Sequence, residues 1–175
     1  GPMATYDFKD ESKGEINPSK FFRKRLDLFA NIRPAKTYPG IRTLTGAFDL
    51  VVVRENTEGF YADRNVESGN SEILVTPDVA ISLRRITRHC SELQVDDVIV
   101  DAMMAHVVRA PERFDVIVTT NMFGDILSDL TAELSGSLGL GGSLNAGLHH
   151  AMGQAAHGSA PDIAGKGIAN PLATI

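Results

Sequence analysis

The sequence Val116-Ile-Val-Thr-Thr-Asn-Met-Phe-Gly-Asp-Ile-Leu-Ser-Asp129 joins an apolar run to an amphipathic one. Its β-branched half predicts a strand over 115–120, and the Asn-Met-Phe-Gly segment predicts a turn that opens a helix over 124–138. Strand and helix patterns also alternate along the rest of the chain. This alternation favours an α/β fold over an all-α or all-β one.

Two carboxylates in this stretch indicate a cation site. Asp125 and Asp129 are four residues apart, so they lie on one face of the predicted helix, where like charges repel. An all-oxygen cluster suits a hard divalent ion such as Mg²⁺ or Mn²⁺, and Asp101 could supply a third oxygen. Two other interpretations stay open: compensation of the helix dipole, and an ordinary solvated helix face.

Working outward, we expect a helix over 20–28 after the start signal Asn17-Pro18, and a buried strand over 48–54. The segment from Arg33 to Gly40 resembles an extended loop. The remaining expectations are a hairpin or arm over 61–75, a helix over 77–91, a second helix that follows Asp97 and ends before Pro111, and a glycine-rich tail over 136–170.

Composition narrows the class of protein. The 175 residues are 43% hydrophobic and 22% charged, which is ordinary for a globular protein of one domain or two small ones. A net charge of -5 argues against general affinity for nucleic acid, and no window approaches the length of a membrane span. With one cysteine, Cys90, and a polar N-terminus instead of a signal core, we expect a cytoplasmic protein.

Three arginines are candidates for binding carboxylates. Arg23, Arg33 and Arg54 each lie at the boundary of a predicted element, and a guanidinium can grip a carboxylate in bidentate fashion. Arginines in such places are also often solvated. Arg54 ends an apolar strand, where α/β sheets place ligand groups. Tyr61 follows it and could donate a proton if its pKa were lowered, although tyrosine is also an ordinary half-buried residue.

Five motifs, in order, closely resemble the isocitrate/isopropylmalate dehydrogenase family, the metal-dependent, β-decarboxylating dehydrogenases of 2-hydroxy acids, including their tartrate/malate-like branch. Two of them are Val53-Arg-Glu-Asn-Thr-Glu-Gly59 and Asn121-Met-Phe-Gly-Asp-Ile-Leu-Ser-Asp129. The others lie at 22–36, 100–103 and 157–171. The resemblance implies an α/β, isopropylmalate dehydrogenase-like fold, mainly its smaller dimer-forming domain with part of the nucleotide domain. It covers 1–175 as a single shortened unit, with the arm at about 61–75 and a cofactor-loop-like tail at 143–175.

The resemblance also implies roles for individual residues. Arg23, Arg33 and Arg54 would hold the carboxylates of a small diacid, and Tyr61 would protonate the enol left after decarboxylation. Asp101, Asp125 and Asp129 would hold Mg²⁺ or Mn²⁺, with Asp101, also a catalytic candidate, reaching across from a second subunit of a homodimer or larger oligomer. The residues implied for cofactor contact are His157, Gly158, Ser159, Ala160, Asp162 and Asn170. An acidic Asp162 favours NAD because it repels a 2′-phosphate.

The sequence departs from the family pattern at the catalytic base. No lysine occurs between Lys36 and Lys166, and Arg88-His-Cys-Ser-Glu-Leu-Gln-Val-Asp96 directly joins the pieces that flank the family's lysine segment. Three hypotheses follow: a shortened NAD-linked dehydrogenase with impaired redox chemistry, a repurposed decarboxylase or tautomerase, and a non-catalytic binding protein. Phe22 lies where the family lines its substrate pocket and would favour a small or apolar substrate group; the alternative is a core phenylalanine.

Overall fold

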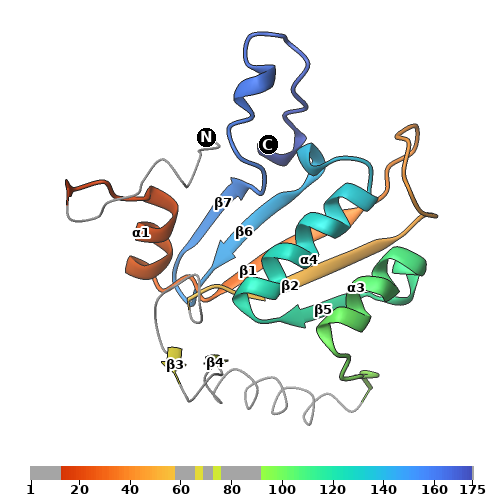
Figure 1. The fold of residues 1–175 in the computed structure, drawn as a ribbon, viewed down its shortest axis with the longest axis horizontal. Helices are drawn as coiled ribbons and strands as arrows, with labels where there is room; N and C mark the ends of the chain where they lie inside the picture. The colour runs from red at the N-terminus through yellow and green to blue at the C-terminus, as the bar shows by residue number, and fades with distance from the viewer. Residues whose placement is uncertain (1–12, 58–65, 69–72, 76–91, 175) are drawn as a thin grey trace.

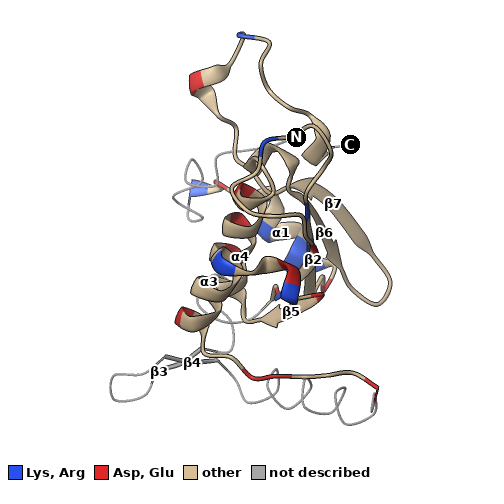
Figure 2. Ribbon diagram, turned by 90° about the vertical axis from the view of Figure 1, so that its right-hand side faces the viewer, with Lys and Arg blue, Asp and Glu red and all other residues tan. Residues whose placement is uncertain are grey.

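A mixed sheet with helices on one face forms the body of the molecule. The structure is a computed structural model, and it describes residues 13–57, 66–68, 73–75 and 92–174. The sheet has five strands in the order β5-β2-β1-β6-β7. Their bounds are Ala30–Lys36 (β1), Asp49–Glu55 (β2), Val116–Thr119 (β5), Gly142–Ala146 (β6) and Ala151–Ala155 (β7). The helices α3 (Val100–Arg109) and α4 (Asn121–Leu134) lie on the same side of it (Figures 1 and 2).

The smaller elements lie at the ends of this body. Helix α1 spans Pro18–Arg25 and is capped by the side chain of Asn17, which accepts a hydrogen bond from the Lys20 amide at 3.2 Å. Strands β3 (Val66–Ser68) and β4 (Ile73–Val75) pair antiparallel. Single 3-10 turns occupy Pro111–Arg113, Leu138–Leu140, Pro161–Ile163 and Leu172–Thr174.

The strand directions bring the end of β2 to the start of α4. Strand β1 is antiparallel to both β2 and β6, whereas β2 runs parallel to β5, with Arg54 opposite Thr119. The carboxyl ends of two parallel strands share one edge of a sheet. Because α4 begins two residues after β5 ends, its first turn lies beside Arg54. The predicted position of Arg54 at a strand end is therefore confirmed.

The core fills the space between α4, α3 and the β2–β5 half of the sheet. Alternate residues of β2 and β5 point toward the helices, as the period of two requires. The buried apolar side chains of this core cluster are Ala35, Phe48, Leu50, Val52, Val107, Ile117, Leu127 and Leu134. Each large aliphatic side chain contributes roughly 1.5–3 kcal/mol on burial. The same face is polar at one end, which carries the site described below. The buried polar side chains of the sheet there are Asn31, Arg33, Arg54, Ser143 and Asn145.

The segment from Arg33 to Lys36 is not a loop; it is the second half of β1. Pro34 had favoured the loop, because proline has no amide hydrogen to donate. In the structure, Val51 lies opposite Pro34 and donates its amide to Asp115, on the β5 side, so the nitrogen of Pro34 faces away from β2. On that side β6 pairs only with residues 30–32. Proline therefore interrupts no pairing at this position.

The predicted turn over 121–124 is also wrong, because α4 already begins at Asn121 and the Gly124 amide donates to the Thr120 carbonyl at 2.8 Å. The helix ends at Leu134, earlier than expected. The tail over 136–170 contains the β6–β7 hairpin, which its glycine content concealed. The strands over 48–54 and 115–120 and the helix before Pro111 are confirmed within a few residues. The helix predicted over 77–91 lies outside the described residues.

Phe22 lies on α1 and is 45% exposed, so the alternative of a core phenylalanine is wrong. In the part of the chain that the structure describes, no helix is long and apolar enough to cross a membrane.

Candidate functional site

Two of the three candidate arginines are buried side by side at the polar end of this face of the sheet. Arg33 in β1 is 7% exposed and Arg54 in β2 is 3% exposed. Their neighbouring strands point both side chains toward α4, because Asn31, Arg33 and Arg54 occupy inward positions of the strand alternation. The solvated alternative is therefore wrong for these two residues. A buried guanidinium requires partners for its charge and its N–H groups.

Helix α4 supplies those partners through its two aspartates. Asp125 Oδ1 forms an ion pair with Arg33 Nη2 at 3.1 Å and accepts a hydrogen bond from Arg54 Nη1 in a shorter contact. Asp129 Oδ1 accepts from Arg33 Nη1 at 3.3 Å. The prediction that both aspartates share one helical face is confirmed. We call Arg33, Arg54, Asp125 and Asp129 the arginine–aspartate cluster.

Arg54 is fixed from a second side by the start of α4. Its Nε and Nη2 both donate to Asn121 Oδ1, at 3.0 and 2.7 Å. The close approach depends on Gly124, where an added Cβ would lie 2.7 Å from both Cβ and Cγ of Arg54. Burial is the main cause that lowers the pKa of Arg54 to about 10; Asp125 opposes this shift, and the nearby Arg33 and Arg23 cations add to it.

The negative charge of Asp129 is less completely compensated than the positive charges of Arg33 and Arg54. Its side chain is half exposed, and burial of the other half raises the pKa of the Asp129 carboxyl. Arg33 opposes that shift, while the neighbouring Asp125 adds to it. A carboxylate whose charge is disfavoured in this way gains from a nearby cation. The donor chemistry of the pair therefore fits a hard divalent ion.

Three buried asparagines were missed by sequence reasoning. Arg33 Nε donates to Asn31 Oδ1 at 2.6 Å, and Arg23 Nη1 donates to Asn56 Oδ1 at 2.9 Å. Both amides reach Asn145 on β6. No local sequence signal identified them, because amides are seldom fully buried and these three are partners only through tertiary contacts. Burial also lowers the pKa of the partly buried Arg23, and the Arg33 charge adds to that shift.

Asp101 does not join the cluster. It lies in the first turn of α3, is exposed, and accepts from the backbone amide of Ala102 at 2.7 Å. Among the described residues no group of three His, Cys, Asp or Glu side chains is placed to hold a metal ion. One chain thus brings together two of the three predicted ligands. Tyr61 lies outside the described residues.

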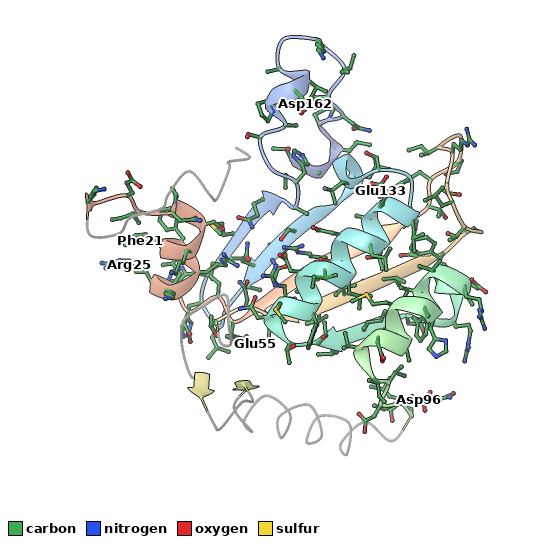
Figure 3. All side chains as sticks on the ribbon, in the orientation of Figure 1. Phe21, Arg25, Glu55, Asp96, Glu133 and Asp162 are labelled. Atoms are coloured by element: carbon green, nitrogen blue, oxygen red, sulfur yellow. The ribbon has the colours of Figure 1, made fainter. Side chains whose placement is uncertain are left out.

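The candidate cofactor residues lie on the loop beyond β7. Figure 3 shows Asp162 on this loop, well apart from Glu55 at the end of β2. The hydrogen bonds within this loop, residues 157–174, are local: the His157 ring donates from Nδ1 to the Gly158 carbonyl at 2.8 Å, and Asn170 Oδ1 accepts from the Leu172 amide at 3.1 Å. Ala160 has a φ of 45°, in the left-handed region. Gly158, Ser159, Ala160 and Asp162 are exposed.

Comparison with known proteins places the chain in one family. The family model described as isocitrate/isopropylmalate dehydrogenase matches residues 1–92 and 81–175. Isocitrate/homoisocitrate dehydrogenase of Thermus thermophilus is 40% identical over 201 residues, covering 93% of this chain and 60% of that protein. For 3-isopropylmalate dehydrogenase of Archaeoglobus fulgidus the identity is 40% over 200 residues, covering 87% and 59%. The crystal structure of isocitrate dehydrogenase from Methylococcus capsulatus superposes with a TM-score of 0.75 at 38% identity, covering 91% of this chain and 60% of that one.

The matches also show how much of the relatives' length this chain contains. It spans about 60% of the length of the Thermus and Archaeoglobus relatives. The alignment with the Thermus protein runs over 201 positions, yet only 93% of the 175 residues take part, so about 38 positions face a gap in this chain. The two matches to the family model overlap at 81–92. This chain belongs to the isocitrate/isopropylmalate dehydrogenase family.

Proposed function

We propose that the arginine–aspartate cluster binds a small hydroxy- or keto-diacid together with Mg²⁺ or Mn²⁺, as one part of a β-decarboxylating enzyme. The observation that carries this proposal is the position of Asp125. Its carboxylate already lies between two buried guanidinium groups, so the site has the charge and geometry that a ligand carboxylate requires. The half-exposed Asp129 beside it gives access from solvent.

The residues of the chain would divide the work as follows. Arg33 and Arg54 orient the diacid, and Arg23 extends the positive surface toward α1. Asp125 and Asp129 hold the divalent ion, with Asp101 from a second copy of the chain as the third ligand; a homodimer is part of this proposal. When bound, the ion stabilises negative charge on the substrate oxygen as CO₂ leaves. Tyr61 is the proposed proton donor to the resulting enol.

Binding is tested by calorimetry. We expect malate to bind the protein in the presence of Mg²⁺, and Arg33→Lys to weaken binding about tenfold or more, because lysine cannot keep the planar fork that reaches Asn31, Ser128 and the ligand at once. Arg25→Lys is the matched control, since Arg25 is exposed on α1. Absence of metal-dependent binding for malate, tartrate, isocitrate and isopropylmalate would contradict the proposal and favour a non-catalytic protein.

Two reactions remain possible for the bound diacid. Oxidation with NAD needs a base for the hydroxyl proton, and a missing general base typically costs 10²- to 10⁴-fold. The absence of lysine from 37 to 165 favours a second candidate: decarboxylation or tautomerisation of a keto acid without redox chemistry. NADH formation with the four hydroxy acids, measured beside turnover of oxaloacetate as a β-keto acid, separates them. A flat NADH trace with oxaloacetate turnover supports the second candidate.

The cofactor proposal rests on the loop beyond β7. The residues His157, Gly158, Ser159, Ala160, Asp162 and Asn170 would contact the adenosine half of NAD. An acidic side chain at Asp162 accepts from ribose hydroxyls and repels a 2′-phosphate. Fluorescence titration with NADH and NADPH tests the choice, and tighter binding of NADPH would contradict it.

A further inference from the structure

We propose that Asn145 is a positioning residue that sets the orientation of Arg33 and Arg23 through two further buried amides. Asn31, Asn56 and Asn145, which we call the amide relay, are 1%, 3% and 0% exposed. They come from β1, from the segment after β2 and from β6, so the relay joins three parts of the chain that are far apart in sequence. This inference rests on the proposed function, because it concerns the arginines that would bind the diacid.

The relay has one hub. Asn145 Oδ1 accepts from Asn31 Nδ2 at 2.8 Å and from Asn56 Nδ2 at 2.9 Å. Asn145 Nδ2 donates to the Met152 carbonyl at 3.2 Å, across the β6–β7 hairpin. A reversed Asn145 amide would put its NH₂ group against two other NH₂ groups and its oxygen against a carbonyl oxygen. Only one orientation of the hub therefore satisfies its neighbours.

That orientation determines the two outer amides. Asn31 Nδ2 uses its two hydrogens on Asn145 Oδ1 and Ser143 Oγ. Asn56 Nδ2 uses its two on Asn145 Oδ1 and the Leu28 carbonyl. With the NH₂ groups committed inward, both Oδ1 atoms turn outward as acceptors. In the described part of the chain every buried side-chain nitrogen and oxygen has a hydrogen-bond partner. If one of these amides were reversed, no unpaired buried group would be available to form replacement hydrogen bonds.

Each outward oxygen receives one arginine. Asn31 Oδ1 accepts from Arg33 Nε at 2.6 Å, and Asn56 Oδ1 accepts from Arg23 Nη1 at 2.9 Å. Fixing Nε of Arg33 leaves its two Nη groups directed at Ser128, Asp125 and Asp129, the side from which a diacid would be gripped. The relay thus couples the placement of two cations on different elements. Arg54 is outside the relay, because its Nε donates to Asn121.

The difference between Arg33 and Arg54 gives the test an internal control. We would measure hydrogen exchange of the arginine Nε–H groups by NMR in the full 175-residue chain. Asn145→Leu removes the hub acceptor at similar volume, so we expect exchange at Arg33 to accelerate about tenfold or more, as loss of a charge-assisted hydrogen bond implies, while Arg54 stays within about twofold. Asn145→Asp keeps the acceptor oxygen and should restore slow exchange at Arg33. Ser135→Ala, which removes a buried hydroxyl bonded to the Ala132 carbonyl, is the matched control for a general loss of packing.

Equal acceleration at Arg33 and Arg54, or none at either in folded Asn145→Leu, would overturn the proposal. If the variants fail to fold, the wild-type protein still provides a test by NMR. Scalar coupling across the hydrogen bonds from Asn31 Nδ2 and Asn56 Nδ2 to Asn145 Oδ1 would support the relay. Hydrogen bonds donated by Asn145 to either amide would overturn it. Malate affinity with Mg²⁺ is measured in parallel and is expected to fall about tenfold in Asn145→Leu only. If the wild-type protein binds no diacid, the proposed function fails while the exchange result stands.

Discussion

The arginine–aspartate cluster and the loop beyond β7 carry the two halves of the proposed chemistry, yet they are built in opposite ways. In the cluster, the bonded groups lie far apart in sequence: Arg33 meets Asp125, and Arg54 meets Asn121. In the loop, the bonds join neighbours one to three residues apart, such as His157 with Gly158 and Ala160 with Ile163. Long-range partners position a binding group before its ligand arrives; local turns leave more of that work to the ligand.

The largest test of this contrast is Asp125→Asn. It removes the carboxylate shared by two buried guanidinium groups, so we expect the free energy of unfolding to fall by about 2–3 kcal/mol, somewhat less than for a fully buried pair because Asp125 is 34% exposed. Urea unfolding measures it. Asp101→Asn, an exposed aspartate in the first turn of α3, should change stability by less than about 0.5 kcal/mol. Equal losses in the two variants would contradict the contrast.

Gly124→Ala is a second test, in which the sign of the change in the free energy of unfolding decides between two effects. Helix propensity alone predicts a gain of about 1 kcal/mol from alanine in α4. The added Cβ would lie 2.7 Å from Arg54 and 3.1 Å from Thr119 Cγ2, so we expect a net loss of about 1–2 kcal/mol instead. Gly153→Ala is the control, because its Cβ would meet nothing within 4 Å. Thermal or urea unfolding that shows stabilisation by Gly124→Ala would mean that α4 does not press on Arg54.

A smaller effect on folding is expected in the loop. Asp162→Ala should leave the free energy of unfolding within about 0.5 kcal/mol of wild type, because Asp162 is exposed. Its affinity for NADH should nevertheless fall about tenfold, the loss expected for one charge-assisted hydrogen bond. Unfolding and fluorescence titration on the same samples separate the two quantities. A large loss of stability would show that the loop is fixed by the fold after all.

The smallest effect is expected for Lys36→Met. Lys36 Nζ and Asp49 Oδ2 are 2.7 Å apart on β1 and β2, and the hydrogen bond with Asp49 raises the pKa of Lys36. Both side chains are more than half exposed, so solvent screens the pair. We expect no change in melting temperature beyond experimental error. A clear destabilisation would show that solvent-exposed ion pairs contribute to this sheet as the buried ones do.

The parts of the molecule that sequence predicted are those with a local signal. The apolar β-branched run before Arg54 and the spacing of Asp125 and Asp129 identified a strand and a shared helical face, and both are confirmed. Pro34 and Gly124 led to two wrong predictions, a loop and a turn, because tertiary neighbours allow them inside a strand and a helix. Pro34 is tolerated because the pairing with β6 stops at residue 32, and Gly124 is placed where the Cβ and Cγ of Arg54 pack against α4. The amide relay could not be predicted, since nothing in the sequence says that Asn31 and Asn145 are partners.

The shared position of Asp125 has a consequence for measured affinities. A diacid that approaches Arg33 and Arg54 meets guanidinium groups that are already neutralised, so its binding is an exchange of one carboxylate for another. The observed free energy of diacid binding is then a difference between two similar contacts. A cation that draws Asp125 away from the arginines makes diacid binding more favourable. A titration with the diacid alone would therefore give a low affinity. The full affinity of the arginines for the diacid would be measured only when the diacid and a divalent cation are added together.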